Sequence, residues 1–322
     1  MAAAGGTAAA GFLRVVFLGN DRWSVPSLEA LAASRHRPRL VVTRVPRPAG
    51  RGLTLRPTAV ADAARRFHLT LHEVETVKRG AGFDALAAAQ PDVLVVVAYG
   101  EILPSAVLEL PRLAPVNVHF SLLPELRGAS PVQHALLRGL DRTGVTTIEM
   151  DEGLDTGPIL LQREEEVRPD DDAGSLGERL AEIGGAVLAS TLDGLAEGTV
   201  PPRPQVGEPT YAPKLQPEDR WIRWDDTAED VVRCVRAMAP DPAASTRFRG
   251  EVLKVFRASV ADERSRSAPG AIAAVDRDGL VVRAGDGAVR LESVGPAGRR
   301  QMSAGEFVRG YRPRPGERLG EG

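Results

Sequence analysis

The first two hundred residues alternate short apolar runs with stretches in which apolar residues recur at helical spacing. This alternation is typical of βαβ units and predicts a doubly wound α/β domain with a mainly parallel sheet. The nearly continuous apolar run at residues 92–97 predicts a central strand that is buried on both faces. The same pattern predicts strands at residues 13–18, 40–42, 116–120, 145–150 and 159–167, and helices at residues 130–138 and 173–195.

The turn after the first predicted strand reads Gly-Asn-Asp-Arg at residues 19–22. A helix is expected after it, with Ser24 placed to cap its N-terminus and Pro26 in its first turn. The Gly-x-Gly-x-x-Gly pattern that cradles a dinucleotide pyrophosphate is missing from this turn. The sequence therefore argues against an NAD or flavin enzyme, in spite of the fold class.

Prolines crowd residues 201–213, which hold five of them. Proline at this density cannot continue a helix or a central strand, so residues 199–212 are predicted to form an extended linker. The linker separates a first domain at residues 12–198 from a second at residues 213–322. Residues 1–11 contain only Ala, Gly and Thr after the Met, and we expect a disordered extension there.

The second domain shows one helical pattern followed by short apolar runs. The helix is predicted at residues 228–238, and the strands at residues 252–256, 270–275, 279–284 and 288–294. Short strands at regular spacing, separated by turns that contain glycine, favour a small β-barrel.

Composition excludes several classes of protein. With 43% hydrophobic and 26% charged residues, the chain is typical of a globular protein, and it has no apolar run of the ~20 residues that a membrane helix needs. A single cysteine, Cys234, excludes an internal disulfide, favours the cytoplasm, and is expected to be a buried structural thiol. Four histidines lack metal-ligand spacing with Asp or Cys, so no metal site is predicted: His36, His68, His72 and His134.

Charge is unevenly distributed along the chain. The net charge is −2, yet residues 231–322 carry 17 Lys and Arg against 11 Asp and Glu. A basic C-terminal segment on an otherwise acidic protein is what phosphate contact requires, although a solvated surface gives the same surplus. Residues 44–56 add an arginine-rich loop that can wrap a phosphate backbone.

Asn117 and His119 lie two residues apart on a predicted strand, so their side chains share one face. If the loop at residues 151–157 folds back against them, Asp155 joins an amide and an imidazole at one place. Asn can donate to a developing oxyanion, His can move a proton near neutral pH, and Asp can orient the His or accept a proton. Each residue alone is more often structural, but the combination suits acyl or formyl transfer to an amine.

The motifs around these residues resemble those of the folate-dependent formyltransferases. The resemblance runs from about residue 12 to the C-terminus. It rests on Arg-Pro-Ala-Gly-Arg-Gly at residues 47–52, Val-Ala-Tyr-Gly at 97–100, Asn-Val-His-Phe-Ser-Leu-Leu-Pro at 117–124, Arg-Gly-Ala-Ser-Pro-Val-Gln at 127–133, Met-Asp-Glu-Gly-Leu-Asp-Thr-Gly at 150–157, and Tyr-Ala-Pro-Lys-Leu at 211–215.

The resemblance implies a reaction, a co-substrate and a partner. It implies transfer of the formyl group of 10-formyltetrahydrofolate to the amino group of methionine on initiator methionyl-tRNA, by Asn117, His119 and Asp155 and without a metal. It also implies an OB-like fold for the second domain, and it implies that the arginine-rich loop enters the acceptor stem. The implied folate contacts are Ser121, Leu122, Leu123, Pro124, Tyr99, Gly100, Ile102 and Leu103, and the implied tRNA contacts are Arg47, Arg51 and Lys214.

Two segments depart from the family pattern. Residues 19–22 replace Gly-Thr-Pro-Glu, and Leu53-Thr54 replaces a basic pair in the arginine-rich loop. Three other functions remain open on the same scaffold: a formyltransferase for a small amine such as a sugar nucleotide or glycinamide ribonucleotide, a catalytically silent tRNA-binding protein, and a hydrolase that releases formate. The intact trio argues against a silent protein.

Overall fold

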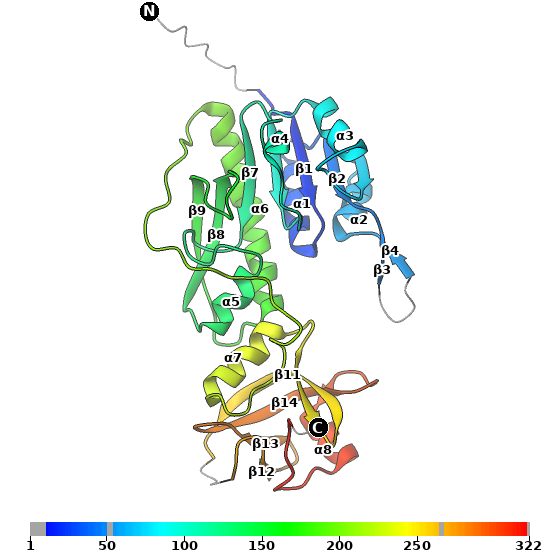
Figure 1. The fold of residues 1–322 in the computed structure, drawn as a ribbon, viewed down its shortest axis with the longest axis vertical. Helices are drawn as coiled ribbons and strands as arrows, with labels where there is room; N and C mark the ends of the chain where they lie inside the picture. Colours follow the sequence, from blue (N-terminus) through cyan, green and yellow to red (C-terminus); the bar gives the residue numbers. More distant parts are fainter. Residues whose placement is uncertain (1–10, 50–53, 264–266, 321–322) are drawn as a thin grey trace, which may run out of the picture. The chain divides into compact units, whose positions relative to one another are not determined.

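The computed structural model describes residues 11–49, 54–263 and 267–320 of the 322-residue chain. The chain forms two compact units (Figure 1). Unit 1 comprises Met1–Pro131, Arg142–Glu166 and Gly177–Pro213, and unit 2 comprises Val132–Asp141, Val167–Leu176 and Lys214–Gly322. All but the last residue of the extension expected at residues 1–11 lie outside the described residues.

Unit 1 is built on a seven-stranded sheet. Its order is β5 (Leu71–Val74), β2 (Leu40–Arg44), β1 (Val15–Gly19), β6 (Val93–Val97), β7 (Ala114–His119), β8 (Arg142–Glu149) and β9 (Ile159–Glu166). The first five strands are parallel, and β8 and β9 continue the sheet antiparallel. Strand β6 stands at the centre with every residue buried, so the predicted central strand and the mainly parallel sheet are confirmed.

Helices lie on both faces of this sheet, which makes the fold doubly wound (Figure 1). One face packs Val16, Leu94 and their neighbours against Leu86 of α3 (Ala81–Ala89) and Val107 of α4 (Ser105–Leu108). Helices α1 (Val25–Ala33), α2 (Ala59–Arg66) and most of α6 (Ala173–Glu197) also belong to unit 1, whereas all but the first residue of α5 (Pro131–Leu137) belongs to unit 2. Helix α6 was predicted at nearly these bounds.

Two glycines of α6 lower its helix propensity but allow close packing. A Cβ atom on Gly177 would lie 2.2 Å from the ring of Trp23, and one on Gly185 would lie 2.8 Å from the carbonyl oxygen of Pro26. Any larger residue at either position therefore separates α6 from the segment that opens α1.

The predicted cap of α1 takes a different role. Ser24 occupies the cap position but makes no capping hydrogen bond; its Oγ donates instead to the carbonyl oxygen of Val97 at 2.7 Å. Asp21 accepts from the backbone N–H of Trp23 at 2.9 Å and caps the preceding 3-10 turn η1 (Arg22–Ser24). Ser24 thereby joins the chain after β1 to the end of β6.

The arginine-rich segment is a β-hairpin rather than an irregular loop. Strands β3 (Arg47–Ala49) and β4 (Thr54–Arg56) pair antiparallel, with Arg47 opposite Arg56. The tip at residues 50–53, which includes Arg51, lies outside the described residues.

Unit 2 holds an antiparallel sheet. Its order is β10 (Ala244–Phe248), β11 (Glu251–Ala261), β14 (Ala288–Pro296), β13 (Leu280–Arg283) and β12 (Ile272–Val275), and β15 (Met302–Ser303) also pairs with β14. The C-terminal segment closes this sheet into a barrel. Leu319 N donates to Gly270 O beside β12 at 2.8 Å, and Gly320 N donates to Arg247 O of β10 at 2.9 Å.

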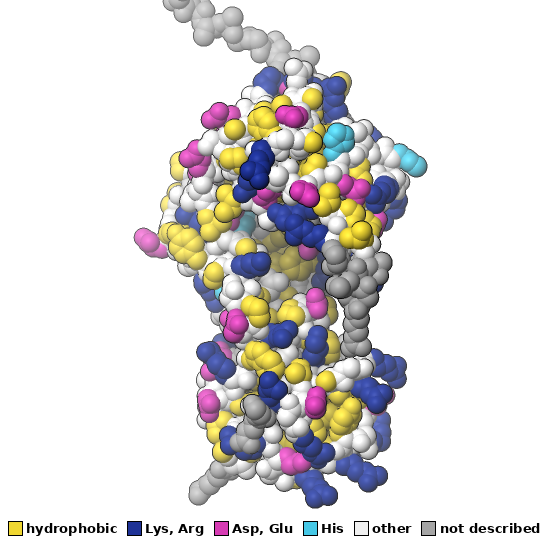
Figure 2. All heavy atoms as spheres, turned by 45° about the vertical axis from the view of Figure 1, so that its right-hand side comes forward, with side chains coloured by type: hydrophobic (Ala, Val, Ile, Leu, Met, Phe, Trp, Pro, Cys, Tyr) yellow, Lys and Arg dark blue, Asp and Glu magenta, His cyan; other side chains and the backbone are white. Residues whose placement is uncertain are grey.

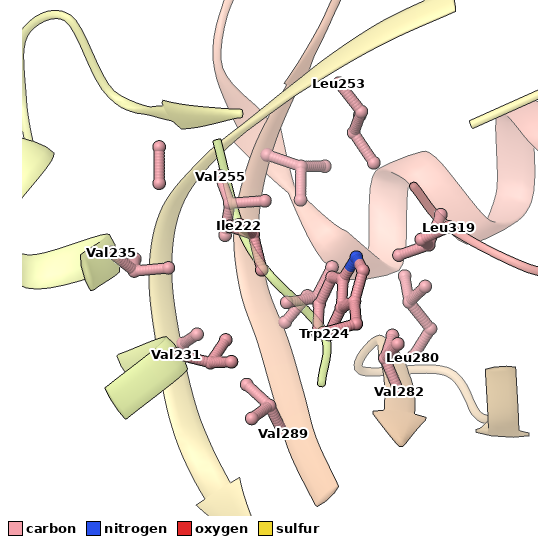
Figure 3. Packing of buried hydrophobic residues seen from close by; sticks show 14 of the residues in the cluster. Ile222, Trp224, Val231, Val235, Leu253, Val255, Leu280, Val282, Val289 and Leu319 are labelled. Atoms are coloured by element: carbon pink, nitrogen blue, oxygen red, sulfur yellow. The ribbon is translucent and has the colours of Figure 1, made fainter. Parts of the chain in front are cut away.

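The core of unit 2 gathers around Trp224 (Figure 3). Helix α7 (Ala228–Met238), which was predicted at these bounds, contributes Val231 and Val235 to it. Cys234 of α7 is half-buried rather than fully buried as expected, and burial raises the pKa of its thiol to about 11. The thiol is therefore protonated at neutral pH and a weak nucleophile, in keeping with a structural role.

Asp92, before β6, ties together the amino-terminal ends of two central strands. Its carboxylate accepts from Arg14 N at 2.9 Å, from Arg14 Nη2 at 3.0 Å and from Arg112 Nε at 2.8 Å. The hydrogen bonds from Arg14 and Arg112 hold the pKa of this buried carboxyl well below its usual range.

Replacing Asp92 by asparagine is expected to lower the free energy of unfolding at pH 7 by about 2 kcal/mol, because the charged partners lose their anion. The depressed pKa means that this stabilisation is present above the unfolded carboxyl pKa of about 3.9 and is lost as pH falls below it. The difference between wild type and variant in urea unfolding should therefore shrink at acid pH. Asp84→Asn, at an exposed position of α3, is the control; an equal loss there would contradict the assignment.

Candidate active site

The three predicted site residues meet at the end of β7. Asn117 and His119 belong to β7, and Asp155 belongs to the loop between β8 and β9. Asn117 Nδ2 donates to Asp155 Oδ1 at 3.3 Å, and His119 Nδ1 lies 3.7 Å from Asp155 Oδ2. The loop folds back as the hypothesis requires, so an amide, an imidazole and a carboxylate share one site.

The hydrogen bonds of His119 fix which nitrogen carries its proton. Its Nε2 lies 2.9 Å from the carbonyl oxygen of Leu126, which can only accept, so Nε2 carries the hydrogen. In the neutral imidazole Nδ1 is then the basic nitrogen, and it faces Asp155. A proton that arrives at Nδ1 turns this contact into a charge-assisted pair.

Asp155 is held by backbone groups as well as by side chains. Its backbone is in the left-handed region, with φ of 53°, and its Oδ2 accepts from the N–H of Gly128 at 2.8 Å. The Asp155 side chain is largely screened from solvent, with 14% of its surface exposed. The carboxylate is therefore fixed between Asn117 and Gly128, with His119 just beyond hydrogen-bond distance.

The Ser-Leu-Leu-Pro segment after β7 turns some of its side chains inward. Ser121 is fully buried, and its Oγ donates to Glu125 O at 2.5 Å. Leu123 is buried in a small cluster with Ile148 and Ile159. Leu122 and Pro124 are half-buried, so part of each side chain reaches the surface. Most of the backbone here is already hydrogen-bonded: Leu123 N donates to Thr146 Oγ1, and Leu123 O accepts from Gln162 Nε2.

A cavity of about 300 Å³ opens at the carboxyl ends of β1, β2 and β6. It is lined by Asn20, Asp21, Arg44, Ala98, Tyr99 and Gly100. Asn20 builds this rim, because its Oδ1 accepts from Arg44 N at 2.8 Å and its Nδ2 donates to Tyr99 O. The cavity lining includes two of the predicted folate contacts but none of the catalytic trio.

The other predicted contacts after β6 differ in exposure. Ile102 is 79% exposed, whereas Leu103 and Tyr99 are buried in the cluster that packs α3 and α4 against the sheet. Burial raises the pKa of Tyr99 to about 12, which keeps its phenol protonated. Of these four residues, Ile102 is exposed, Tyr99 and Gly100 line the cavity, and Leu103 is buried.

Two family models match the chain. The model described as formyl transferase covers residues 13–192, and the model of the formyl transferase C-terminal domain covers residues 214–312. The chain belongs to the formyl transferase family.

Curated relatives cover almost the whole chain. The methionyl-tRNA formyltransferase of Pelotomaculum thermopropionicum is 41% identical over 310 residues, which are 96% of this chain and 99% of the relative. That of Halorhodospira halophila is 42% identical over 305 residues, with 94% and 98% covered. Among solved structures, HypX from Aquifex aeolicus in complex with tetrahydrofolic acid has a TM-score of 0.62 at 20% identity. That likeness covers 93% of this chain but 48% of HypX, and it shows the fold alone.

The sequence analysis did not identify three residues that contact the candidate site. They are Leu126 and Gly128, which contact His119 and Asp155, and Gln205, which contacts the Asp155 backbone. The Arg-Gly motif at residues 127–128 was a usable signal for the first two. No sequence signal pointed to Gln205, since it lies in a proline-rich stretch 50 residues from Asp155.

By residue type, His36 and the acidic residues were further candidates for a metal site. Buried His36 accepts from Leu13 N at 3.0 Å, and burial lowers the pKa of its imidazole. In the described part of the chain, no group of His, Cys, Asp and Glu could hold a metal ion. None of the described helices is long and apolar enough to cross a membrane.

Proposed function

We propose that this protein transfers the formyl group of 10-formyltetrahydrofolate to the amino group of methionine on initiator methionyl-tRNA, in the cytoplasm, and so supports translation initiation. The observation that carries the proposal is the 41–42% identity, over nearly the full length, to relatives named methionyl-tRNA formyltransferase. The cluster of Asn117, His119 and Asp155 supports the chemistry, since it combines a donor, a base and a carboxylate.

The folate supplies an activated formyl group when it is bound. The amine nitrogen of methionine forms a bond to the formyl carbon, the bond to the folate nitrogen breaks, and the proton lost by the amine balances the one gained by the folate. Asn117 Nδ2 is placed to donate to the formyl oxygen as negative charge develops on it. Nδ1 of His119 takes the proton from the amine, and the adjacent carboxylate of Asp155 stabilises the imidazolium.

For the folate we assign contacts in two segments, the one that follows β6 and the one that follows β7. The accessible groups are the half-buried side chains of Leu122 and Pro124, together with the exposed Ile102 and Gly100. Buried Ser121, Leu123 and Leu103 act by shaping the segments that carry these groups, because their side chains pack within the protein. Tyr99 lines the cavity beside Gly100.

For the tRNA we assign phosphate contacts in both parts of the chain. Exposed Arg47 lies on β3, and exposed Lys214 follows the proline-rich stretch. Arg51, which lies outside the described residues, is the third proposed contact. Residues 299–314 add exposed arginines at positions 299, 300, 309, 312 and 314. On the face drawn in Figure 2, Lys and Arg side chains are spread over unit 2 among Asp and Glu.

Formyl transfer and tRNA binding belong to different parts of the chain. Residues 12–198 carry the formyl transfer, and residues 213–322 bind the tRNA. Residues 199–212 connect the two parts. The 17 Lys and Arg against 11 Asp and Glu of residues 231–322 support the second assignment.

The direct test is an assay with purified protein, 10-formyltetrahydrofolate and charged initiator tRNA, with formylmethionine as the product measured. If phosphates provide the binding, kcat/KM for tRNA should fall steeply with salt, by about 10³-fold or more between 50 and 200 mM salt for ~6 phosphate contacts. Arg47→Ala should lower kcat/KM at low salt and reduce the log–log slope by about 1, with folate binding unchanged.

Arg163→Ala, which removes an exposed arginine of β9, is the matched control. A flat salt response together with a fully active Arg47→Ala variant would transfer the assignment to a formyltransferase for a small amine.

A further inference from the structure

Residues 203–212, which the prolines mark as a connection, are hydrogen-bonded to the segment that holds the trio. Arg127 donates its N–H to Thr210 O at 2.8 Å and accepts from Ala212 N at 2.7 Å. Thr210 Oγ1 also accepts from the N–H of Leu126 at 2.9 Å. The carbonyl oxygen of Leu126 accepts the hydrogen bond from His119 Nε2. Residues 203–212 therefore support the imidazole indirectly, by holding the backbone of Leu126.

Gln205 makes the most direct of these contacts with the site. Its Nε2 donates to the carbonyl oxygens of both Asp155 and Gly157, at 2.8 Å each. Its Oε1 accepts from Arg127 Nε at 3.1 Å and from Arg127 Nη2 at 2.6 Å. Both N–H groups and both lone pairs of the carboxamide are therefore used, and Gln205 joins the Asp155 loop to the Arg-Gly motif.

We propose that Gln205 is a positioning residue for formyl transfer: it holds the backbone of Asp155 so that the carboxylate stays between Asn117, His119 and Gly128. The proposal rests on the function proposed above and adds a residue to its machinery. It also gives residues 203–212 a part in the chemistry, besides connecting two parts of the chain.

The backbone of Asp155 explains why this support matters. A non-glycine residue with φ of 53° is in a sparsely populated region and needs its surroundings to hold it. The two hydrogen bonds from Gln205 fix the carbonyls on either side of Thr156, and with them the turn. Without them the loop can relax, and a displacement of about 1 Å at a catalytic group can cost up to ~10²-fold in rate.

The test compares three variants of the full-length protein in the tRNA formylation assay. Gln205→Met keeps the side-chain volume and removes every hydrogen bond, and Gln205→Glu keeps the acceptor for Arg127 but removes the donor to the two carbonyls. Both should lower kcat about 10-fold or more, with KM for folate and for tRNA within about twofold of wild type. Val206→Ala, at the adjacent position with 85% exposure, should keep the wild-type kcat.

The outcomes separate the possible explanations. A kcat of Gln205→Met near the wild-type value would overturn the positioning role and leave formyl transfer intact. A slow Gln205→Met with a normal Gln205→Glu would also overturn it, because Arg127 and not the Asp155 loop would then be the partner that matters. Absence of formylmethionine with the wild-type protein would instead remove the proposed function itself.

Gln205→Glu keeps the proposal testable if Gln205→Met does not fold, and a fourth variant tests another contact of residues 203–212. Thr210→Val keeps the side-chain shape and removes the acceptor for Leu126 N, which supports His119 through the same connection. We expect a several-fold loss of kcat with an unchanged melting temperature. Full activity in both Thr210→Val and Gln205→Glu would overturn the role of residues 203–212 in catalysis.

Discussion

Replacing Asp155 by alanine is expected to lower kcat for tRNA formylation by at least about 10²-fold, the usual scale for acid–base groups. The variant loses the carboxylate that faces His119 Nδ1 at 3.7 Å and the acceptor for Asn117 Nδ2 at 3.3 Å. An imidazolium formed when the amine loses its proton then has no counter-charge, and the amide of Asn117 is free to rotate. Because the loss is in the transition state, KM for folate should change little.

Asp155→Asn separates charge from geometry. Asparagine can still accept from Gly128 N and keeps the size of the side chain, but it places a neutral group beside His119. We expect it to be nearly as slow as alanine, in steady-state assays at pH 7. Glu152→Ala removes another carboxylate of the same loop, one that contacts Ser105, and should keep a normal kcat. Turnover of Asp155→Asn within about threefold of wild type would refute the counter-charge role.

Replacing Trp224 by alanine is expected to destabilise unit 2 by about 3–5 kcal/mol, the range for removing a large buried aromatic side chain. Trp224 is 5% exposed, and its Nε1 donates to Thr246 Oγ1 at 3.0 Å. Its ring also packs against the C-terminal segment that closes the barrel: a Cβ on Gly320 would be 3.1 Å from Trp224 Cδ1. The variant loses core packing and the support of this closure together.

Thermal denaturation followed by circular dichroism measures the effect, and the tRNA formylation assay measures its consequence. Trp224→Phe restores part of the volume and should recover part of the stability. Val260→Ala, on the same sheet with 55% exposure, should change the melting temperature little. If Trp224→Ala melted like wild type, the core in Figure 3 would not depend on this residue.

Local signals were sufficient for the elements whose pattern is complete within a few residues. The apolar run of β6 and the helical spacing of α7 predicted both elements, because burial on both faces or on one helical face imposes a period that the chain shows directly. Strand β10 and helix α8 (Ala304–Tyr311) were missed. Helix α8 contains two glycines, but the capping box of Ser303 and Glu306 was a readable signal.

The sequence by itself also determined which chemical groups the candidate site offers, since Asn117, His119 and Asp155 are residue types with defined proton and hydrogen-bond capacities. Only the tertiary structure decided how they are held. The carbonyl that fixes the His119 tautomer, the N–H that holds Asp155, and the carboxamide of Gln205 come from segments 7, 27 and 50 residues away from the group they contact. Backbone groups are the same in every residue, and a lone glutamine has no period, so such contacts exist only once the chain has folded and brought those segments together.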